Sequence, residues 1–519
     1  MTHLQEIARQ IAADNLRCVY GIPGSGPSLV LLDALEAAGV RFQLTHFEGS
    51  AAIMAGAAGR LSGRSGVCIS IKGPGLANML PGLAACALES LPVVSISECY
   101  LPATPPQKCH KRMDHAQLLS AVAKHRAALC SDAPRFNDLA RLAEAETPGV
   151  VHLDIAESPF ESAGALPARP QTLFADDRLL RAIDLLQAAR RPAVIAGTLS
   201  IRRGWTDRLN RLSVPVFSTA AAKGAVDETL PHAAGVFTGA GGALAPEKSI
   251  LPAADLVVAL GLRHNEALNV QPFACPSIHI DPLGTTHSFG FRFDCQLEGT
   301  APQVEEMFGR LADRSWGLDR IEVSRRALAE KMFADPFLPA HVLRCAAAHF
   351  SHSARLVPDT GNFCTIAEHV WPVVRPELYL SSGQGRYMGI GLPLGIGAAM
   401  HDPGVPTLVA TGDGGIGMFA AEIKIAAQNR LPLVVILMCD ARLSSIRAGA
   451  IAKRLTQAPT RIHQPSWLAA IEGLGVPGVR VGSENELEKA LDGWKGHGPF
   501  YIEACFDADR YQRMTEGIR

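Results

Sequence analysis

No excess of charge of either sign marks this sequence. Its 49 lysines and arginines are balanced by 50 aspartates and glutamates, which leaves a formal net charge of −1 over 519 residues. A protein that binds nucleic acid or an anionic membrane through its overall field carries a clear basic excess. We therefore expect neither nucleic acid nor a membrane among its partners, and any bound anion must be held by a local site.

Long apolar runs and paired cysteines are also missing. Apolar runs such as LPLVVILMC at 431–439 are about half as long as a membrane span, so they are better explained as buried parallel strands. The start of the chain has no basic segment followed by an apolar core, as a secretory signal would. The 12 cysteines are scattered singly, without a zinc-binding spacing. These absences predict a cytoplasmic protein with free thiols.

Short β-rich runs alternate with helical stretches in three blocks along the chain. Stretches at 158–172, rich in proline and alanine, and at 335–340 separate the blocks. Repeated strand–turn–helix units are typical of parallel sheets covered by helices. We therefore predict three Rossmann-like α/β domains, at residues 1–165, 175–330 and 338–519.

The stretch 302–333, before the third block, is mixed in charge and is predicted to be helical. The third block itself contains the segments that matter most for a site. Strands are predicted in the runs 355–362, 378–383, 407–415, 431–440 and 499–506, with helices at 389–400 and 419–429.

The tetrapeptide Gly412-Asp413-Gly414-Gly415 ends one apolar strand, and the next buried strand ends at Asp440. Neighbouring parallel strands joined by one helix bring both aspartates to the same sheet edge. Two carboxylates are suitable Mg²⁺ ligands, and a helix beginning near Ile416 favours a bound phosphate. A Gly-Asp-Gly tripeptide alone more often forms a simple turn. The paired aspartate favours the metal site.

This arrangement resembles the diphosphate and magnesium signature of thiamine-diphosphate enzymes. It is most similar to the group that contains acetolactate synthase, benzoylformate decarboxylase and oxalyl-CoA decarboxylase. The resemblance implies thiamine diphosphate and Mg²⁺ as cofactors, with Asp413, Asp440 and the main-chain carbonyl of Arg442 as metal ligands. The sequence departs from the family at Cys439, where an asparagine is usual.

The first block carries a second motif of the same family in the expected order. Glu48, which follows His46-Phe47 and opens a run of small residues, is similar to the glutamate of the family's H-E-x-x-A segment. The implied role of Glu48 is catalytic: a hydrogen bond to the cofactor pyrimidine ring that lets the 4′-amino group take the proton from C2. A glutamate at this position is equally expected as a simple helix cap.

Three further stretches agree with the resemblance. The turn that begins at Lys72 resembles S-G-P-G-x-x-N, with lysine in place of a small residue. The segment 385–393 resembles G-x-M-G-x-G-L-P, which implies that Met388 lies under the cofactor and that the carbonyl of Arg386 accepts from its amino group. Asp359-Thr360-Gly361-Asn362 resembles the turn that helps to hold the diphosphate.

The sequence says less about the substrate. Ser25 falls where benzoylformate decarboxylase carries a substrate-contacting serine, and Ser445 and Ile446 are expected to border the substrate. The resemblance places Ile446 where pyruvate decarboxylases carry an acidic proton relay, which disfavours a simple pyruvate decarboxylase. The segment 109–115 is strongly basic: with Lys72, its His110 and Lys111 could form a pocket for a carboxylate, sulfonate or phosphonate. A solvated loop explains these charges equally well.

The resemblance implies non-oxidative decarboxylation or carboligation of a 2-oxo acid. The first alternative is an acyl-CoA lyase or decarboxylase, which needs an adenine-nucleotide pocket in the middle domain. The second is a cofactor-binding homologue without activity. FAD remains possible because members of this family occur with and without it. A homodimer or homotetramer with active sites between subunits is also implied.

Overall fold

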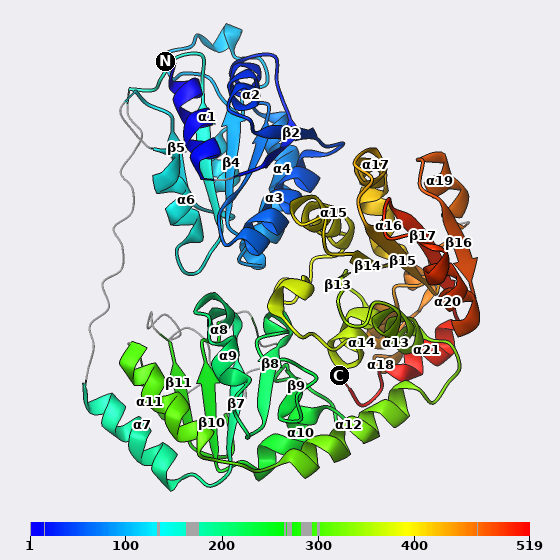
Figure 1. Cartoon of the computed structure of the whole chain (residues 1–519). Helices are drawn as coiled ribbons and strands as arrows, with labels where there is room; N and C mark the ends of the chain where they lie inside the picture. Colours follow the sequence, from blue (N-terminus) through cyan, green and yellow to red (C-terminus); the bar gives the residue numbers. More distant parts are fainter. Residues whose placement is uncertain are drawn as a thin grey trace.

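Three parallel-sheet α/β domains build the protein, as predicted (Figure 1). The structure is a computed structural model. It describes residues 2–14, 16–131, 135–161, 176–263, 266, 272–281, 293–297, 301–463 and 466–518. Most of the predicted linker at 158–172 lies outside these residues, and the predicted domain boundaries stay predictions.

The first domain is a six-stranded sheet in the order β2-β1-β3-β4-β6-β5, with every neighbouring pair parallel. Its central strands are buried along their whole length, as expected for a sheet covered on both faces. The strands are β1 (Cys18–Ile22), β2 (Arg41–Leu44), β3 (Gly66–Ser70), β4 (Val93–Glu98), β5 (Ala123–Ala128) and β6 (Val150–Ile155). The helices are α1 (His3–Ala13), α2 (Pro27–Ala37), α3 (Glu48–Ser62), α4 (Pro74–Leu88), η1 (Pro106–Lys108), α5 (His115–Leu119) and α6 (Phe136–Glu144).

The middle domain is a second six-stranded sheet, ordered β12-β11-β10-β7-β8-β9. Its strands are β7 (Pro192–Ala196), β8 (Val216–Thr219), β9 (Ala233–Phe237), β10 (Leu256–Leu260), β11 (Ser277–Ile280) and β12 (Cys295–Leu297). The helices are α7 (Asp176–Ala188), α8 (Thr198–Arg202), α9 (Thr206–Leu209), η2 (Ala220–Ala222), α10 (Pro246–Ile250), η3 (Leu251–Ala253), α11 (Ala301–Ala312) and α12 (Leu318–Met332). The stretch 302–333 is thus helical, but it breaks before Gly317, which adopts the left-handed conformation.

The third domain is a five-stranded sheet in the order β13-β14-β15-β17-β16. Its strands are β13 (Arg355–Pro358), β14 (Thr407–Gly412), β15 (Leu433–Cys439), β16 (Gly478–Val481) and β17 (Phe500–Cys505). The helices are α13 (Pro339–His349), α14 (Asn362–Val370), η5 (Pro376–Leu378), α15 (Gly391–His401), α16 (Asp413–Phe419), η6 (Ala420–Glu422), α17 (Ile423–Gln428), α18 (Ser444–Ala452), η7 (Ala458–Thr460), α19 (Leu468–Gly473), α20 (Glu484–Gly493) and α21 (Ala508–Met514).

The strand predicted at 378–383 is wrong. This segment forms only an isolated bridge between Tyr379 and Leu356. The reason is that a buried carboxylate from the first domain, Glu89, accepts the main-chain N–H groups of Gln384 at 3.1 Å and Gly385 at 2.7 Å. The chain therefore turns toward Glu89 instead of continuing along the sheet.

The first and third domains share one apolar core, formed where α3 packs against α15. Both helices carry small residues on the contact. At Gly397, an added Cβ would lie 2.6 Å from Cα of Met54 and 2.7 Å from its carbonyl oxygen, so the two backbones touch. Close packing of this kind fixes how the two domains lie relative to each other.

Among the described residues, no helix is both long and apolar enough to span a membrane. All 12 cysteines are free, as the sequence predicts.

Candidate active site

The third-domain half of the site lies where β14 and β15 end. The two strands are parallel neighbours with Gly412 opposite Met438, so the predicted pairing of their carboxyl ends is confirmed. Helix α16 begins at Asp413 rather than near Ile416, and Gly412 occupies the N-cap position. Asp413 is therefore the first residue of a helix whose free N–H groups favour negative charge.

Asp413 and Asp440 lie next to each other. One oxygen of Asp413, Oδ2, accepts the main-chain N–H of Asp440 at 2.8 Å and of Ala441 at 2.7 Å. Burial, together with the charge of Asp413, raises the pKa of Asp440 to about 6, against the hydrogen bond that Ser444 donates. Burial likewise raises the pKa of Asp413. Two adjacent, partly buried carboxylates whose pKa values are raised by burial are a suitable place for a divalent cation.

The backbone that follows Asp440 is held firmly. Leu443 donates its N–H to the carbonyl of Thr460 at 2.8 Å, and Ile462 donates to the carbonyl of Ala441 at 2.9 Å. These bonds fix the chain on both sides of Arg442, whose carbonyl is the third predicted metal ligand. The thiol of Cys439 is among the groups that hydrogen-bond Asp413, although the family carries asparagine there.

Asp359 is buried beneath the start of α16. It accepts the main-chain N–H of Gly389 at 2.8 Å and the hydroxyl of Thr411 at 3.1 Å, and burial raises its pKa to about 6. A Cβ added at Gly415 would lie 2.1 Å from Oδ2 of Asp359, so only glycine allows this approach. Asp359 thus joins the turn after β13 to the turns that carry Met388 and Gly415.

The remaining predicted diphosphate residues converge on this edge. Thr360 donates its hydroxyl to the carbonyl of Tyr387 at 3.2 Å, and Gly361 is the N-cap of helix α14. Asn362, the first residue of α14, accepts the hydroxyl of Ser445 at 2.6 Å. The buried Nδ2 of Asn362 has no hydrogen-bond partner among the described residues. A buried amide donor without a partner fits an anionic oxygen such as that of a phosphate.

Two predicted cofactor contacts lie beside these groups. A Cβ added at Gly414 would lie 3.2 Å from Sδ of Met388, so Met388 borders the Gly-Asp-Gly turn. Arg386 adopts a positive φ of 50°, and its guanidinium pairs with the buried Glu368 at 2.8 Å. The ion pair with Glu368 therefore holds the side chain of Arg386, while its main chain forms part of the turn that leads to Met388.

The first-domain half of the site is built around Glu48, the first residue of α3. Its side chain is buried and accepts Nδ2 of Asn78 at 3.2 Å. Asn78 belongs to the segment that begins at Lys72, so the two first-domain motifs meet. Within the described part of the chain, no hydrogen bond or ion pair joins Glu48 to the third domain.

The predicted substrate residues are divided between two places. Ser445 and Ile446 lie on α18, and the side chain of Ile446 is 63% exposed. Lys72 and Lys111 line one pocket of about 380 Å³ in the first domain, but His110 does not line it. Ser25 is exposed on the loop before α2, and no contact among the described residues brings it to that pocket.

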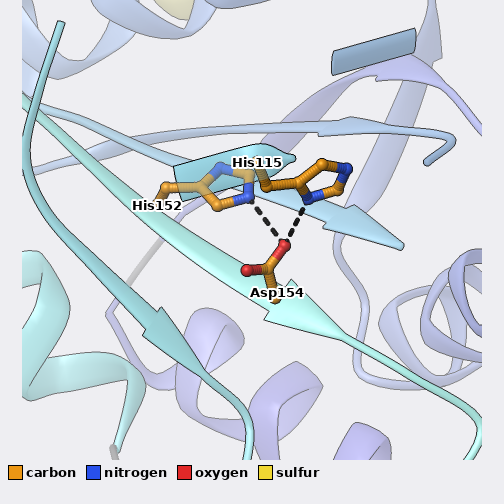
Figure 2. A group of neighbouring side chains, drawn as sticks. All are labelled: His115, His152 and Asp154. Carbon is orange, nitrogen blue, oxygen red and sulfur yellow. Dashed lines mark hydrogen bonds and ion pairs between the residues drawn. The ribbon is translucent and has the colours of Figure 1, made fainter. Parts of the chain in front are cut away.

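Sequence reasoning missed a buried group under this pocket, shown in Figure 2. Asp154, near the end of β6, accepts from His115 Nδ1 at 2.6 Å and from His152 Nε2 at 3.2 Å, and it pairs with Arg126 at 2.5 Å. Burial acts to raise the pKa of Asp154, but these hydrogen bonds outweigh it and hold the pKa well below the usual range. The residues come from distant segments, so no local motif signals them.

A buried glutamate on β4 was also missed. Glu98 accepts the hydroxyl of Ser28 at 2.6 Å and pairs with Lys72 at 2.8 Å. It therefore ties the glycine-rich loop before α2 to the turn that carries Lys72. Its side chain is fully buried, and a lone glutamate at a strand end carries no distinctive sequence signal.

Comparison with known proteins gives family matches in all three domains. Residues 1–117 match the thiamine pyrophosphate enzyme N-terminal TPP binding domain, residues 179–304 the central domain, and residues 359–504 the C-terminal TPP binding domain.

Curated relatives match over nearly the whole chain. The chain is 24% identical to a probable acetolactate synthase large subunit of Methanococcus aeolicus, which covers 95% of this chain and 89% of the relative. It is 26% identical to the acetolactate synthase isozyme 3 large subunit of Escherichia coli, and this match covers 93% of this chain and 90% of the relative. It is 28% identical to the probable 2-ketoarginine decarboxylase AruI of Pseudomonas aeruginosa, and this match covers 95% of this chain and 91% of the relative. With these matches and the geometry at both sheet edges, the chain belongs to the family of thiamine-diphosphate-dependent enzymes.

Proposed function

We propose that this protein uses thiamine diphosphate and Mg²⁺ to carry out non-oxidative chemistry on a 2-oxo acid. The reaction is decarboxylation, followed by protonation or by transfer to a second carbonyl compound. The observation that supports it best is the meeting of Asp413 and Asp440 at the sheet edge that also carries Asn362, whose Nδ2 has no hydrogen-bond partner among the described residues. Two carboxylates next to phosphate-binding donors are the protein's share of a Mg²⁺–diphosphate site.

In this proposal each element of the third-domain edge has one task. Asp413, Asp440 and the carbonyl of Arg442 hold the metal, and Asn362 with the N–H groups at the start of α16 holds the diphosphate. The carbonyl of Arg386 accepts from the cofactor amino group. The bound cofactor supplies the electron sink that the carbon–carbon cleavage requires.

Glu48 is assigned the proton-moving role. Glu48 is buried and hydrogen-bonds Asn78 of its own domain, and among the described residues no hydrogen bond or ion pair joins it to the third domain. We therefore propose a homodimer or a dimer of dimers in which a second subunit supplies the other half of the site. The side chains of Met418 and Ile446, 51% and 63% exposed near the third-domain edge, support a covering partner there.

The alternative on acyl-CoA substrates is disfavoured by the middle domain. Nucleotides bind at the carboxyl ends of the strands in such domains. Here the carboxylate of Glu266 accepts the main-chain N–H of Thr198 at 3.0 Å, after β7, and the hydroxyl of Thr219 at 3.0 Å, at the end of β8. A buried carboxylate in this place repels a phosphate, so we propose that neither FAD nor an adenine nucleotide binds there.

The inactive-homologue alternative is disfavoured by the joint presence of Glu48, Asp413 and Asp440, because an inactive protein is free to lose any of them. A panel of 2-oxo acids and acyl-CoAs with added thiamine diphosphate and Mg²⁺ tests the proposal through CO₂ release and product mass. Turnover of a 2-oxo acid supports it. Turnover of acyl-CoAs alone, or of neither class, contradicts it.

A further inference from the structure

We infer that the pocket beside the Lys72 turn recognises a second anionic group, so that the substrate is a 2-oxo acid with a carboxylate, sulfonate or phosphonate at its far end. This inference rests on the proposed function and names its substrate class. The pocket has a volume of about 380 Å³, and its walls carry the cations Lys72, Lys111, Arg112 and Arg126.

The pocket lies next to the first-domain half of the site, which is built around Glu48. Gly73 lines it, and two residues further on a Cβ added at Gly75 would lie 3.4 Å from Oε1 of Glu48. Two residues of chain span at most about 7 Å. A short aliphatic chain covers a distance of that order. A small molecule whose carbonyl lies near Glu48 would therefore be able to reach the pocket with its far end.

Two of the four cations are already paired. Lys72 pairs with Glu98 at 2.8 Å, and Arg126 pairs with Asp154 at 2.5 Å. These pairs fix the walls but leave little net charge for a ligand.

The other two cations are available. Among the described residues, Lys111 and Arg112 form no ion pair with an acidic side chain. Asp114 also lines the pocket, but its carboxylate caps helix α5 by accepting the N–H of Gln117 at 3.0 Å. Lys111 and Arg112 are therefore the charges that a ligand can use, and charge-assisted hydrogen bonds to anions are strong.

Three of the four cations lie near Cys99. Cys99 also lines the pocket. Burial raises the pKa of its thiol to about 12, while the charges of Arg126, Arg112 and Lys72 act in the opposite direction. All three cations therefore lie close enough to Cys99 to influence it, from three different segments of the chain.

The main chain of Lys111 packs closely against Gly73, in the turn that begins at Lys72. A Cβ added at Gly73 would lie 1.9 Å from the carbonyl oxygen of Lys111. Next to it, Tyr100 donates its hydroxyl to the carbonyl of His110 at 2.8 Å. The basic loop is thus anchored by its backbone, which leaves the side chain of Lys111 free for a ligand.

The buried group of Figure 2 supports the pocket from below and is not a metal site. Potential ligand atoms of His115, His152 and Asp154 lie within 4.8 Å of one another, as a bound metal would require. However, Gly73 donates its N–H to Nε2 of His115 at 3.3 Å, so the proton of His115 lies on Nδ1 and is donated to Asp154. With Arg126 also on Asp154, the group is a closed hydrogen-bond network that positions Gly73.

Matched substrates test the inference on the holoenzyme. 2-Oxoglutarate and 2-oxopentanoate differ only in the terminal carboxylate, and sulfopyruvate and phosphonopyruvate are compared with 2-oxobutanoate. We expect kcat/KM for at least one dianion to exceed that of its neutral partner about tenfold or more. The best of the three dianions identifies the anionic group.

Variants then locate the effect. Lys111→Met and Arg112→Met should each lower kcat/KM for that dianion about tenfold, mainly through KM, and leave the neutral partner within about twofold. Lys111→Arg should restore most of the loss. Lys108→Met, on the same loop but outside the pocket lining, is the matched control and should behave as wild type.

A binding measurement separates this inference from the proposed function. Calorimetry with glutarate and pentanoate, which cannot be decarboxylated, needs no turnover. Tighter binding of glutarate that is lost in Lys111→Met supports the pocket even if no 2-oxo acid reacts, in which case the proposed function fails alone. Equal kcat/KM for dianions and their neutral partners, or variants that weaken both alike, overturns the inference.

Discussion

Asp440 donates its main-chain N–H to the carboxylate of Asp413 at 2.8 Å, although 27 positions separate them in the sequence. The bond joins the ends of β14 and β15 and places the two acidic side chains on one side of the sheet edge. The same bond orients Asp413, so the backbone at 440 positions one proposed metal ligand while its side chain supplies another.

Replacing Asp413 by asparagine should remove the Mg²⁺ dependence of cofactor binding. An amide is a weaker ligand than a carboxylate for this hard cation. We expect calorimetry to show thiamine diphosphate binding at least about tenfold more weakly in the presence of Mg²⁺. Asp207→Asn, at an exposed position on α9, is the control. Binding that still depends on Mg²⁺ as in wild type would remove Asp413 from the metal site.

Glu48→Gln should separate cofactor binding from catalysis. The amide keeps the size of the side chain but cannot exchange the proton that the carboxylate handles. We expect kcat to fall about 100- to 10,000-fold, with the affinity for thiamine diphosphate changed only a few-fold. Glu472→Gln, exposed on α19, should keep full activity. A Glu48→Gln enzyme with normal kcat would show that Glu48 only caps α3.

The stabilisation that ionised Asp154 contributes should be lost in acid. Its pKa is held below the usual range in the folded state, and the unfolded value is about 3.9. The unfolded state therefore binds the proton more readily, and the stabilisation is complete above about pH 4 and decreases as the pH falls toward the folded pKa.

The test is the dependence of Tm on pH. Between about pH 5 and about pH 3, the Tm of wild type should fall more steeply than that of Asp154→Asn, which has no proton to bind there. Asp33→Asn, at an exposed position on α2, should follow the wild-type slope. Parallel profiles for wild type and Asp154→Asn would show that the network does not depend on the charge.

The middle domain should reject adenine-containing cofactors. Because Glu266 occupies the N–H of Thr198, FAD, ADP and coenzyme A should leave the Tm unchanged. Thiamine diphosphate with Mg²⁺ should raise it, because a ligand that binds only the folded state stabilises it. Purified protein with a flavin absorbance band, or a higher Tm with ADP, would refute this prediction.

Local patterns were sufficient for the fold class and for the third-domain edge. The pairing of Asp413 with Asp440 follows from strand order alone, because parallel neighbours end at one edge. The start of α16 and the segment at 378–383 were misjudged, the latter because Glu89, nearly 300 positions away, accepts its N–H groups. Residues that act through distant partners, such as Asp154, carry no local signal.

The contact of Gly397 with Met54 restricts how this enzyme can open. Backbones that already touch leave no room for one helix to slide over the other or for a hinge to swing between the first and third domains. Entry of substrate and exit of product must then depend on smaller movements, such as rotations of the exposed side chains of Lys111 and Ile446. We therefore expect the first and third domains of one chain to stay fixed to each other during turnover, so that rotation between them does not limit the rate.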